Sequence, residues 1–332
     1  MLKFFVHKYT LSPQVKLNSI SGKAEREGAL LKIEWPDKKV GYADLFPWPE
    51  LGDLMLEDQL EGIKKGHLST LAEQSIWLAN RDLKLRAAQK NAVQNLQKIK
   101  NHFTIPDYTI ITEKKLYELK TAGFSTLKIK VGRDWLSELE WITQVLTQNH
   151  FMIRLDFNSN GEFSTIERMM RSLPVGLKAK IEFIEDPFPF DLEAWTEVSK
   201  FAPLALDQEY SNVKKEEWDN LAEPLPFRFL VIKPARQDVM KAVKQAVDRN
   251  LKIVFTSSMD HALGVVHAAC VASEYKATHP NLVMEAGCLT THLYLPNEFS
   301  SRMICQGPYL TQVPGYGIGF DEVLGALSWE PL

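Results

Sequence analysis

Six ionisable side chains stand at or near the ends of short apolar segments in the middle of the chain. Two lysines, Lys128 and Lys130, lie in the KIK segment, and a third, Lys233, follows the segment FLVI. Three further apolar segments end in a carboxylate, at Asp156, Glu185 and Asp207. Each follows apolar residues of the kind that build a core. Carboxylates bind hard cations and lysines transfer protons, so the pattern indicates metal-assisted acid–base chemistry.

The segments that carry these residues read as strands of a parallel sheet. From residue 107 onward, short apolar runs alternate with amphipathic helical stretches at a step of about 25 residues, which is typical of repeated strand–helix units. Eight such units close most economically into a barrel, and the lack of a Gly-rich first turn weakens the alternative of a doubly wound open sheet. We expect eight strands, at 108–111, 126–131, 152–157, 181–185, 204–207, 229–232, 253–256 and 282–284.

In a barrel of this kind the carboxyl ends of the strands face the active-site mouth. The strands of Lys130 and Lys233 would lie four apart in a ring of eight, so these lysines would reach the mouth from opposite sides. The three carboxylates lie on the strands between them, where they would repel one another unless a cation lies among them. Oxygen ligands suit Mg²⁺, with Mn²⁺ as a substitute, whereas zinc prefers Cys and His. Any one carboxylate could instead cap a following helix.

A cation beside a substrate carboxylate would stabilise the negative charge that develops when an α-proton leaves. Lys128 and Lys130 share one face of their strand, because residues i and i+2 point the same way. A lysine beside a second ammonium group and a cation is expected to have a lowered pKa and to serve as a base. The residues therefore favour proton abstraction next to a carboxylate.

Several weaker candidates each have a structural alternative. Arg154 shares a strand face with the first carboxylate, and it could bind a substrate carboxylate or form a structural ion pair. Ser257 and Ser258 could donate hydrogen bonds to substrate oxygens or cap the next helix. Asn158 could support the metal site or cap a turn. Gly287 could allow the backbone to approach a ligand closely or could form a plain turn.

The composition of the chain is that of an ordinary globular protein. It has 332 residues, of which 45% are hydrophobic and 24% charged, with a net charge of -3. This charge gives no global basic field for nucleic acid, and no apolar run approaches the ~20 residues of a membrane helix. Three scattered cysteines and an N-terminus without signal-peptide features favour a cytoplasmic protein. We expect a monomer that acts on a small-molecule carboxylate without a nucleic acid, membrane or obligate protein partner.

The two ends of the chain differ from the middle. The first ~100 residues read as mixed α+β, with strands near 2–9 and 29–35, a hairpin turn at 36–39, and helices over 54–66 and 71–99. The Gly-rich segment 314–321 is expected to let the tail pack back on the N-terminal part. We therefore predict an α+β capping domain over 1–103, completed by the tail 298–332, and a barrel catalytic domain over 104–297.

Together these motifs resemble the muconate-lactonising subgroup of the enolase superfamily. The resemblance rests on KIK at 128–130, RLDFN at 154–158, EDP at 185–187, LDQE at 206–209, IKP at 232–234 and SSMDHALG at 257–264. It implies a modified TIM-type (β/α)₇β barrel with an N-terminal α+β capping domain, and Mg²⁺ bound by the three carboxylates. Within the subgroup the chain is most similar to the o-succinylbenzoate synthase family of menaquinone biosynthesis. The short chain, the segment 41–53 and Arg154 two residues before a metal ligand carry that likeness.

This resemblance implies a hydro-lyase that converts 2-succinyl-6-hydroxy-2,4-cyclohexadiene-1-carboxylate to 2-succinylbenzoate by syn-dehydration. Lys130 would abstract the α-proton and then help to expel the hydroxyl group. Lys233 would stabilise the enediolate, and Lys128 would tune Lys130 and contact the carboxylate. Gln208 departs from the family, in which a Glu at this position could ion-pair with the lysine across the ring.

Two alternatives remain. N-acylamino-acid racemases and dipeptide epimerases share the scaffold and also use two opposed lysines. Dipeptide epimerases usually carry Asp-x-Asp after the last strand, where this chain has Glu-Ala-Gly at 285–287. An inactive barrel that acts as a binding or scaffold protein is the alternative from another class, although every metal and lysine position is filled.

Overall fold

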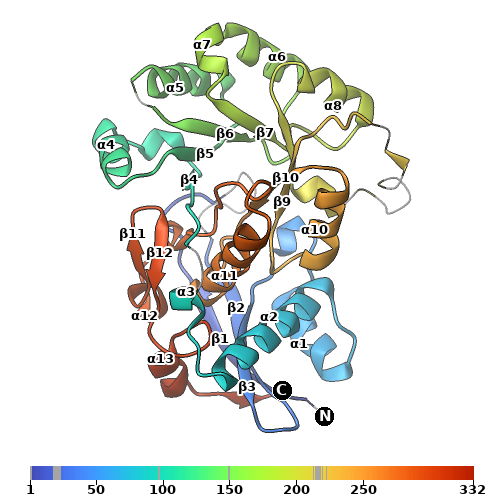
Figure 1. The fold of residues 1–332 in the computed structure, drawn as a ribbon, viewed down its shortest axis with the longest axis vertical. Helices are drawn as coiled ribbons and strands as arrows, with labels where there is room; N and C mark the ends of the chain where they lie inside the picture. The colour runs from blue at the N-terminus through green and yellow to red at the C-terminus, as the bar shows by residue number, and fades with distance from the viewer. Residues whose placement is uncertain are drawn as a thin grey trace. The chain divides into compact units, whose positions relative to one another are not determined.

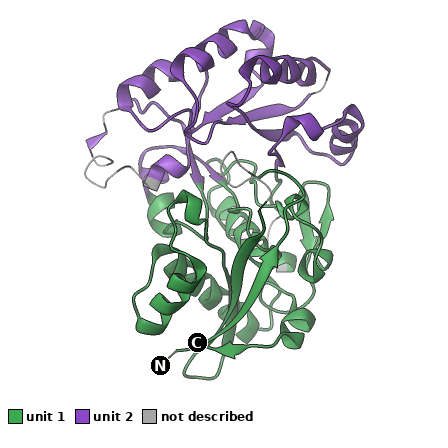
Figure 2. Ribbon diagram, turned by 180° about the vertical axis from the view of Figure 1, so that it is seen from behind, with its two compact units in different colours: residues 1–101, 232–244, 255–332 green, residues 102–231, 245–254 purple. Residues whose placement is uncertain are grey.

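The computed structural model describes residues 2–17, 24–95, 98–148, 150–211, 213, 218, 220–221 and 223–332. The chain divides into two compact units, which Figure 2 colours separately. Unit 1 comprises Met1–Asn101, Ile232–Lys244 and Phe255–Leu332, and unit 2 comprises His102–Val231 and Gln245–Val254. Unit 1 thus includes segments that the sequence analysis assigned to the barrel, and the domain limits at 103 and 297 stay a prediction.

Unit 2 is built on a sheet of seven strands in the order β10-β9-β8-β7-β6-β5-β4. The strands are β4 (Phe103–Ile105), β5 (Thr126–Lys130), β6 (Met152–Asp156), β7 (Ile181–Glu185), β8 (Leu204–Leu206), β9 (Phe229–Ile232) and β10 (Lys252–Phe255). Adjacent strands from β4 to β9 are parallel, and Asp156 is paired with Lys130 on one side and Glu185 on the other. The chemistry-bearing ends of neighbouring strands are therefore in register.

Helices cover one face of this sheet, as Figure 1 shows for α5 to α8. The described helices of unit 2 include α4 (Glu113–Thr121), α5 (Trp135–Gln148), α6 (Phe163–Ser172), α7 (Val175–Lys178) and α8 (Leu192–Ser199). In α6 the buried residues Ile166, Met169 and Met170 recur at helical spacing, which gives one apolar face. Asp191 begins α8 by accepting a hydrogen bond from the backbone N–H of Ala194.

Two of the eight expected strands are wrong in position. Residues 108–110 form the 3₁₀ helix η2 (Tyr108–Ile110), and the first strand of the sheet is β4, which precedes Pro106. Residues 282–284 belong to no strand. Instead, within unit 1, Ala286 forms a parallel bridge with Asn101 and Gly287 forms one with Thr256.

Unit 1 contains an antiparallel sheet in the order β13-β1-β2-β3. Its strands are β1 (Lys3–Leu11), β2 (Arg26–Glu34), β3 (Val40–Leu45) and β13 (Glu330–Pro331). The expected hairpin turn is confirmed, with hydrogen bonds between Trp35 and both Lys38 and Lys39. The C-terminal β13 pairs with β1, so the tail is part of this sheet.

Helices α1 (Leu56–Lys65), α2 (Thr70–Ala87) and α3 (Ala92–Asn95) follow the first three strands. The expected helix over 71–99 is therefore too long, since α2 ends at Ala87. Gly41 of β3 lies so close to α2 that a Cβ there would be 2.0 Å from the carbonyl oxygen of Ala79. This contact explains why a glycine occupies the second position of this packed strand.

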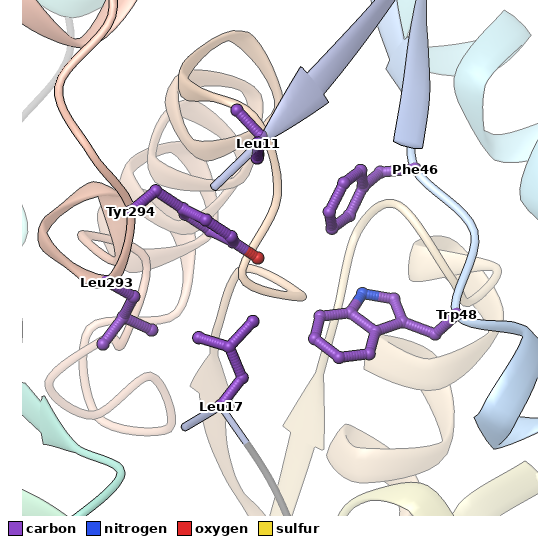
Figure 3. Packing of buried hydrophobic residues seen from close by; sticks show 6 residues of the cluster. All are labelled: Leu11, Leu17, Phe46, Trp48, Leu293 and Tyr294. Atoms are coloured by element: carbon purple, nitrogen blue, oxygen red, sulfur yellow. The ribbon is translucent and has the colours of Figure 1, made fainter. Parts of the chain in front are cut away.

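The rest of unit 1 consists of short elements and one long buried helix. The long helix is α11 (Ala262–Thr278), and the short elements are η1 (Pro49–Leu51), η4 (Thr291–Leu293), α12 (Glu298–Ser301), the hairpin of β11 (Ile304–Gln306) and β12 (Tyr309–Gln312), and α13 (Asp321–Ala326). Two further elements are not confined to unit 1: η3 (Gln208–Ser211) lies in unit 2, and α10 (Val239–Asp248) has residues in both units. Figure 3 shows the apolar cluster that joins β1, the end of β3 and η4: Leu11, Leu17, Phe46, Trp48, Leu293 and Tyr294. In the described part of the chain, none of the helices combines the length and apolarity that a membrane crossing requires.

Candidate active site

The carboxyl ends of β5 to β8 bring one lysine and three carboxylates together. The Nζ of Lys128 lies 2.9 Å from an oxygen of Asp156 and 2.6 Å from an oxygen of Glu185. Asp207 follows β8, and its negative charge raises the pKa values of both Lys128 and Glu185. All four side chains are buried. The structure therefore gathers the three expected metal ligands around one ammonium group.

The charges in this cluster shift two pKa values strongly. Burial raises the pKa of Glu185 well above its usual value; Lys128 opposes this, and the negative charges of Asp156 and Asp207 raise it further. Burial alone would lower the pKa of Lys128, but the three carboxylates raise it above its usual range. With every carboxylate ionised, three negative charges would face one ammonium group here, and such a set favours an added cation.

The donor set fits a hard divalent cation. All three acidic side chains offer oxygen atoms, and they carry more negative charge than Lys128 balances, which suits Mg²⁺ or Mn²⁺ better than zinc. The Lys128 ammonium lies between Asp156 and Glu185 in this arrangement. Within the described ranges, no three or more His, Cys, Asp or Glu side chains are already arranged around a metal position. Which residues ligate a metal therefore stays a prediction.

Lys130 is the second buried lysine of β5, with the fully buried Ile129 between it and Lys128. Its Nζ donates a hydrogen bond of 3.3 Å to Oδ1 of Asn158. The backbone N–H of Asn158 in turn donates to Oδ1 of Asp156 at 3.0 Å. Asn158 has a left-handed backbone with a φ of 48°, which turns the chain sharply after β6. This residue therefore connects the candidate base to the first carboxylate.

Lys233 follows β9, and three strands separate β9 from β5 in the sheet order. Its backbone N–H donates to Oε1 of Gln237 at 3.0 Å, and its carbonyl accepts from the backbone N–H groups of Arg236 and Gln237. This turn fixes the main chain at Lys233. Lys233 belongs to unit 1, so its position across the mouth from Lys130 stays a prediction.

Arg154 is fully buried and makes its contacts with protein groups. Its Nε lies 2.7 Å from Oε2 of Glu182, its Nη1 lies 2.7 Å from Nδ1 of His102, and its guanidinium is 5.0 Å from the ring centre of Phe183. These contacts are those of the ion-pair alternative. Binding of substrate by Arg154 stays a prediction.

Ser257, Ser258 and Gly287 lie in unit 1 and are held by local hydrogen bonds. The Oγ of Ser257 is 2.8 Å from Oγ1 of Thr290, and the backbone N–H of Ser258 donates to Asp260 at 3.0 Å. The N-cap of α11 is His261, so the capping alternative for the two serines is wrong. Gly287 donates its N–H to the carbonyl of Phe255 at 2.8 Å, within the bridge to Thr256. Their roles toward a substrate stay predictions.

Sequence reasoning missed a buried pair of acids in unit 1. Asp44 accepts hydrogen bonds from the Tyr9 hydroxyl at 2.5 Å and from the His261 N–H at 3.1 Å. Asp260 lies close by, since a Cβ on Gly264 would meet both acidic side chains at 2.7 Å. Burial raises the pKa of Asp260 to about 6 and that of Asp44 well above its usual value. Asp260 lies in the SSMDHALG motif, but no feature of the sequence indicated that Asp44 on β3 lies close to it.

Two arginines hold the end of the segment 41–53, which carries part of the family likeness. The Nη2 of Arg236 lies 2.7 and 2.6 Å from the two carboxylate oxygens of Asp53. Arg26 pairs with Glu50, and its guanidinium lies 3.9 Å from the ring centre of Trp48. Residues 48–53 are thus fixed on the remainder of unit 1 by charged contacts at both ends.

Comparison with family models assigns both halves of the chain. Residues 4–85 match the model described as O-succinylbenzoate synthase, N-terminal domain, and residues 112–324 match Enolase C-terminal domain-like. The second match defines the class, a protein with an enolase-type C-terminal domain. The curated o-succinylbenzoate synthase of Bdellovibrio bacteriovorus is 45% identical over 332 residues, which cover 100% of this chain and 99% of that protein. The chain therefore belongs to the o-succinylbenzoate synthase family of the enolase superfamily.

Solved structures with low sequence identity share the fold. The dipeptide epimerase of Enterococcus faecalis V583, complexed with Mg and L-Leu-L-Tyr, has a TM-score of 0.77 and 18% identity, covering 96% of this chain and 98% of its own. The L-Ala-D/L-Glu epimerase of Bacillus subtilis has a TM-score of 0.76 and 14% identity, with coverages of 95% and 97%. These similarities confirm the predicted modified (β/α)₇β barrel with an N-terminal α+β capping domain.

Proposed function

We propose that this chain is a Mg²⁺-dependent hydro-lyase, an o-succinylbenzoate synthase. It converts 2-succinyl-6-hydroxy-2,4-cyclohexadiene-1-carboxylate to 2-succinylbenzoate and water in menaquinone biosynthesis. The observation that carries the proposal is the 45% identity over the whole chain to a curated synthase. The buried group of Asp156, Glu185 and Asp207 around Lys128 supports the chemistry.

The three carboxylates would hold Mg²⁺, or Mn²⁺ in its place. When bound, the cation supplies a fixed positive charge beside the substrate carboxylate, where negative charge accumulates as the α-proton leaves. The chain positions these side chains on adjacent strand ends and keeps them buried, which strengthens electrostatic interactions within the site.

The lysines would carry the proton transfers. Lys130, unprotonated before reaction, would take the α-proton and then return a proton to the leaving hydroxyl group on the same face of the substrate. The hydrogen bond from Lys130 to Asn158 orients its amine. Lys128 would contact the substrate carboxylate, and Lys233 would stabilise the developing charge from the other side. Because the product is aromatic, the site mainly needs to ease removal of the α-proton.

The remaining roles are part of the same proposal. Ser257, Ser258 and Gly287 would contact the substrate, and Arg154 would do so if its ion pair rearranges. Gln208 stands where the family commonly has a Glu that could ion-pair with Lys233. We further propose a monomer that acts on this small carboxylate in the cytoplasm, with no obligate protein partner.

The test is turnover of the purified substrate, followed by formation of the aromatic product in the ultraviolet. Wild type should be active with Mg²⁺ and inactive in EDTA, and Lys130→Ala should lose about 10²- to 10⁴-fold in rate, the usual share of an acid–base group. Lys200→Ala, which removes an exposed lysine paired with Glu197 on α8, is the matched control and should keep full rate. Normal turnover by Lys130→Ala would remove that lysine from the mechanism.

The alternative activity is tested with the same protein. Dipeptide epimerases share this fold, and racemisation of an N-acylamino acid or epimerisation of a dipeptide needs the same two lysines. Racemisation of N-succinyl amino acids without dehydration of the synthase substrate would favour the alternative. No reaction with any of these substrates would favour a binding protein.

A further inference from the structure

We propose that Asp186 and Glu209 are positioning residues, whose carboxylates hold the loops after β6, β7 and β8 in the arrangement that binds the metal. The inference rests on the metal site of the proposed function. The two residues occur in the EDP and LDQE motifs, next to or near Glu185 and Asp207. Both are buried, and both accept hydrogen bonds from loops other than their own.

Asp186 joins the loop after β7 to the loop after β8. Its Oδ1 accepts the backbone N–H of Asp207 at 2.9 Å, and its Oδ2 accepts those of Gln208 at 2.7 Å and Glu209 at 3.3 Å. One carboxylate thus receives three successive N–H groups, beginning at an expected metal ligand. The backbone of Asp186 has a φ of 39°, a left-handed conformation that is strained for a non-glycine residue. The three hydrogen bonds hold this conformation directly after Glu185.

Glu209 joins the same region to the loop after β6. Its Oε1 accepts the Ser159 hydroxyl at 2.6 Å, and its Oε2 accepts the backbone N–H of Phe190 at 3.0 Å. The backbone N–H of Ser159 also donates to the carbonyl of Asp186 at 2.8 Å. Each of the three loops that follow an expected ligand is therefore tied to the other two.

A carboxylate suits both positions because the hydrogen-bond partners named above are all donors, and each of its two oxygens accepts. An amide has only one accepting oxygen, and its NH₂ group would face backbone N–H groups in the place of the other oxygen. Asp186→Asn and Glu209→Gln keep the side-chain size but break some of the hydrogen bonds that join the loops after β6, β7 and β8. The ligand oxygens would then be less well ordered before the metal arrives, and ordering them would reduce affinity. Removing supports of this kind typically weakens metal binding 10–100-fold.

The experiment measures Mn²⁺ binding to the full chain without substrate, by titration calorimetry and by electron paramagnetic resonance of free Mn²⁺. Asp186→Asn and Glu209→Gln should each weaken binding about 10–100-fold, while saturating metal restores much of the rate. Asp82→Asn is the control, because Asp82 is a buried carboxylate of unit 1 that accepts the backbone N–H groups of Tyr42 and Ile318 at 2.9 and 2.8 Å. It should lose stability and keep wild-type affinity for Mn²⁺.

Wild-type affinity in both Asp186→Asn and Glu209→Gln would overturn the inference. An equal loss of affinity in Asp82→Asn would also overturn it, since affinity would then follow stability alone. If Asp186→Asn does not fold, Glu209→Gln decides the question. Failure of wild type itself to bind Mn²⁺ would overturn the metal site of the proposed function, which distinguishes that failure from failure of the positioning role.

Discussion

Arg154→Met tests whether the buried arginine of β6 stabilises the fold or binds substrate. Methionine has a similar length and no charge, so the change removes the ion pair to Glu182 and the contact with His102. Breaking a buried ion pair from one side costs about 3–5 kcal/mol, because the other charge loses its partner. The Glu182 side chain is 15% exposed and keeps some hydration. We therefore expect the free energy of unfolding to fall by about 3 kcal/mol, the lower end of that range.

The assay is equilibrium unfolding in urea, followed by tryptophan fluorescence and circular dichroism. The double variant Arg154→Met/Glu182→Met should be more stable than Arg154→Met alone, because it leaves no unpaired carboxylate. Arg171→Met is the matched control, since Arg171 is an exposed arginine paired with Glu167 on α6. Its loss should stay within about 1 kcal/mol.

The kinetic arm of the same experiment separates the two roles. If Arg154 acts through the fold, the folded fraction of Arg154→Met should keep a KM close to that of wild type. An unchanged free energy of unfolding together with a strongly raised KM would refute this reasoning. That result would assign Arg154 to the substrate carboxylate.

Three further changes test the electrostatics and packing. Lys128→Met leaves two buried carboxylates without their ammonium group, so the free energy of unfolding without metal should fall by about 3–5 kcal/mol. Added Mg²⁺ should restore part of this stability, and an unchanged midpoint of thermal unfolding would contradict the prediction. Burial raises the pKa of Asp260 from 3.8 to about 6, so wild type loses stability as pH rises through that window. Asp260→Asn removes this loss and should gain up to about 3 kcal/mol over wild type between pH 4 and pH 7.5 in urea unfolding; a constant difference would contradict the shifted pKa. Gly41→Ala places a Cβ 2.0 Å from a carbonyl oxygen of α2 and should cost about 1–3 kcal/mol in the same assay, whereas Gly176→Ala, with open space around it, should change stability by under about 0.5 kcal/mol; equal effects would contradict the packing.

The central strands could be predicted because each combines an apolar run with a polar end residue. β5, β7 and β9 begin at the residues that the sequence indicated, and Lys128 and Lys130 share a face as strand alternation requires. The meeting of Asp156, Glu185 and Asp207 followed from the regular spacing of strand and helix, because parallel neighbours align their carboxyl ends. The identity of the residues and the order of the strands were sufficient for that inference.

Other features depend on contacts that no local pattern reveals. Tyr108–Ile110 is apolar enough for a strand, but Asp107 caps a 3₁₀ turn there by accepting the N–H of Thr109. β13 is two residues long and is defined only by its pairing with β1. The proximity of Asp44 and Asp260 joins residues 216 positions apart, which their local segments do not indicate.

The central claim is that one divalent cation is held by three strand-end carboxylates between two lysines. The direct measurement is the anomalous difference map of a crystal soaked with Mn²⁺ and the product 2-succinylbenzoate. The account predicts one strong peak bonded to oxygens of Asp156, Glu185 and Asp207, with the amines of Lys130 and Lys233 on opposite faces of the bound acid. A peak bonded to other residues, or both amines on one face, would contradict it.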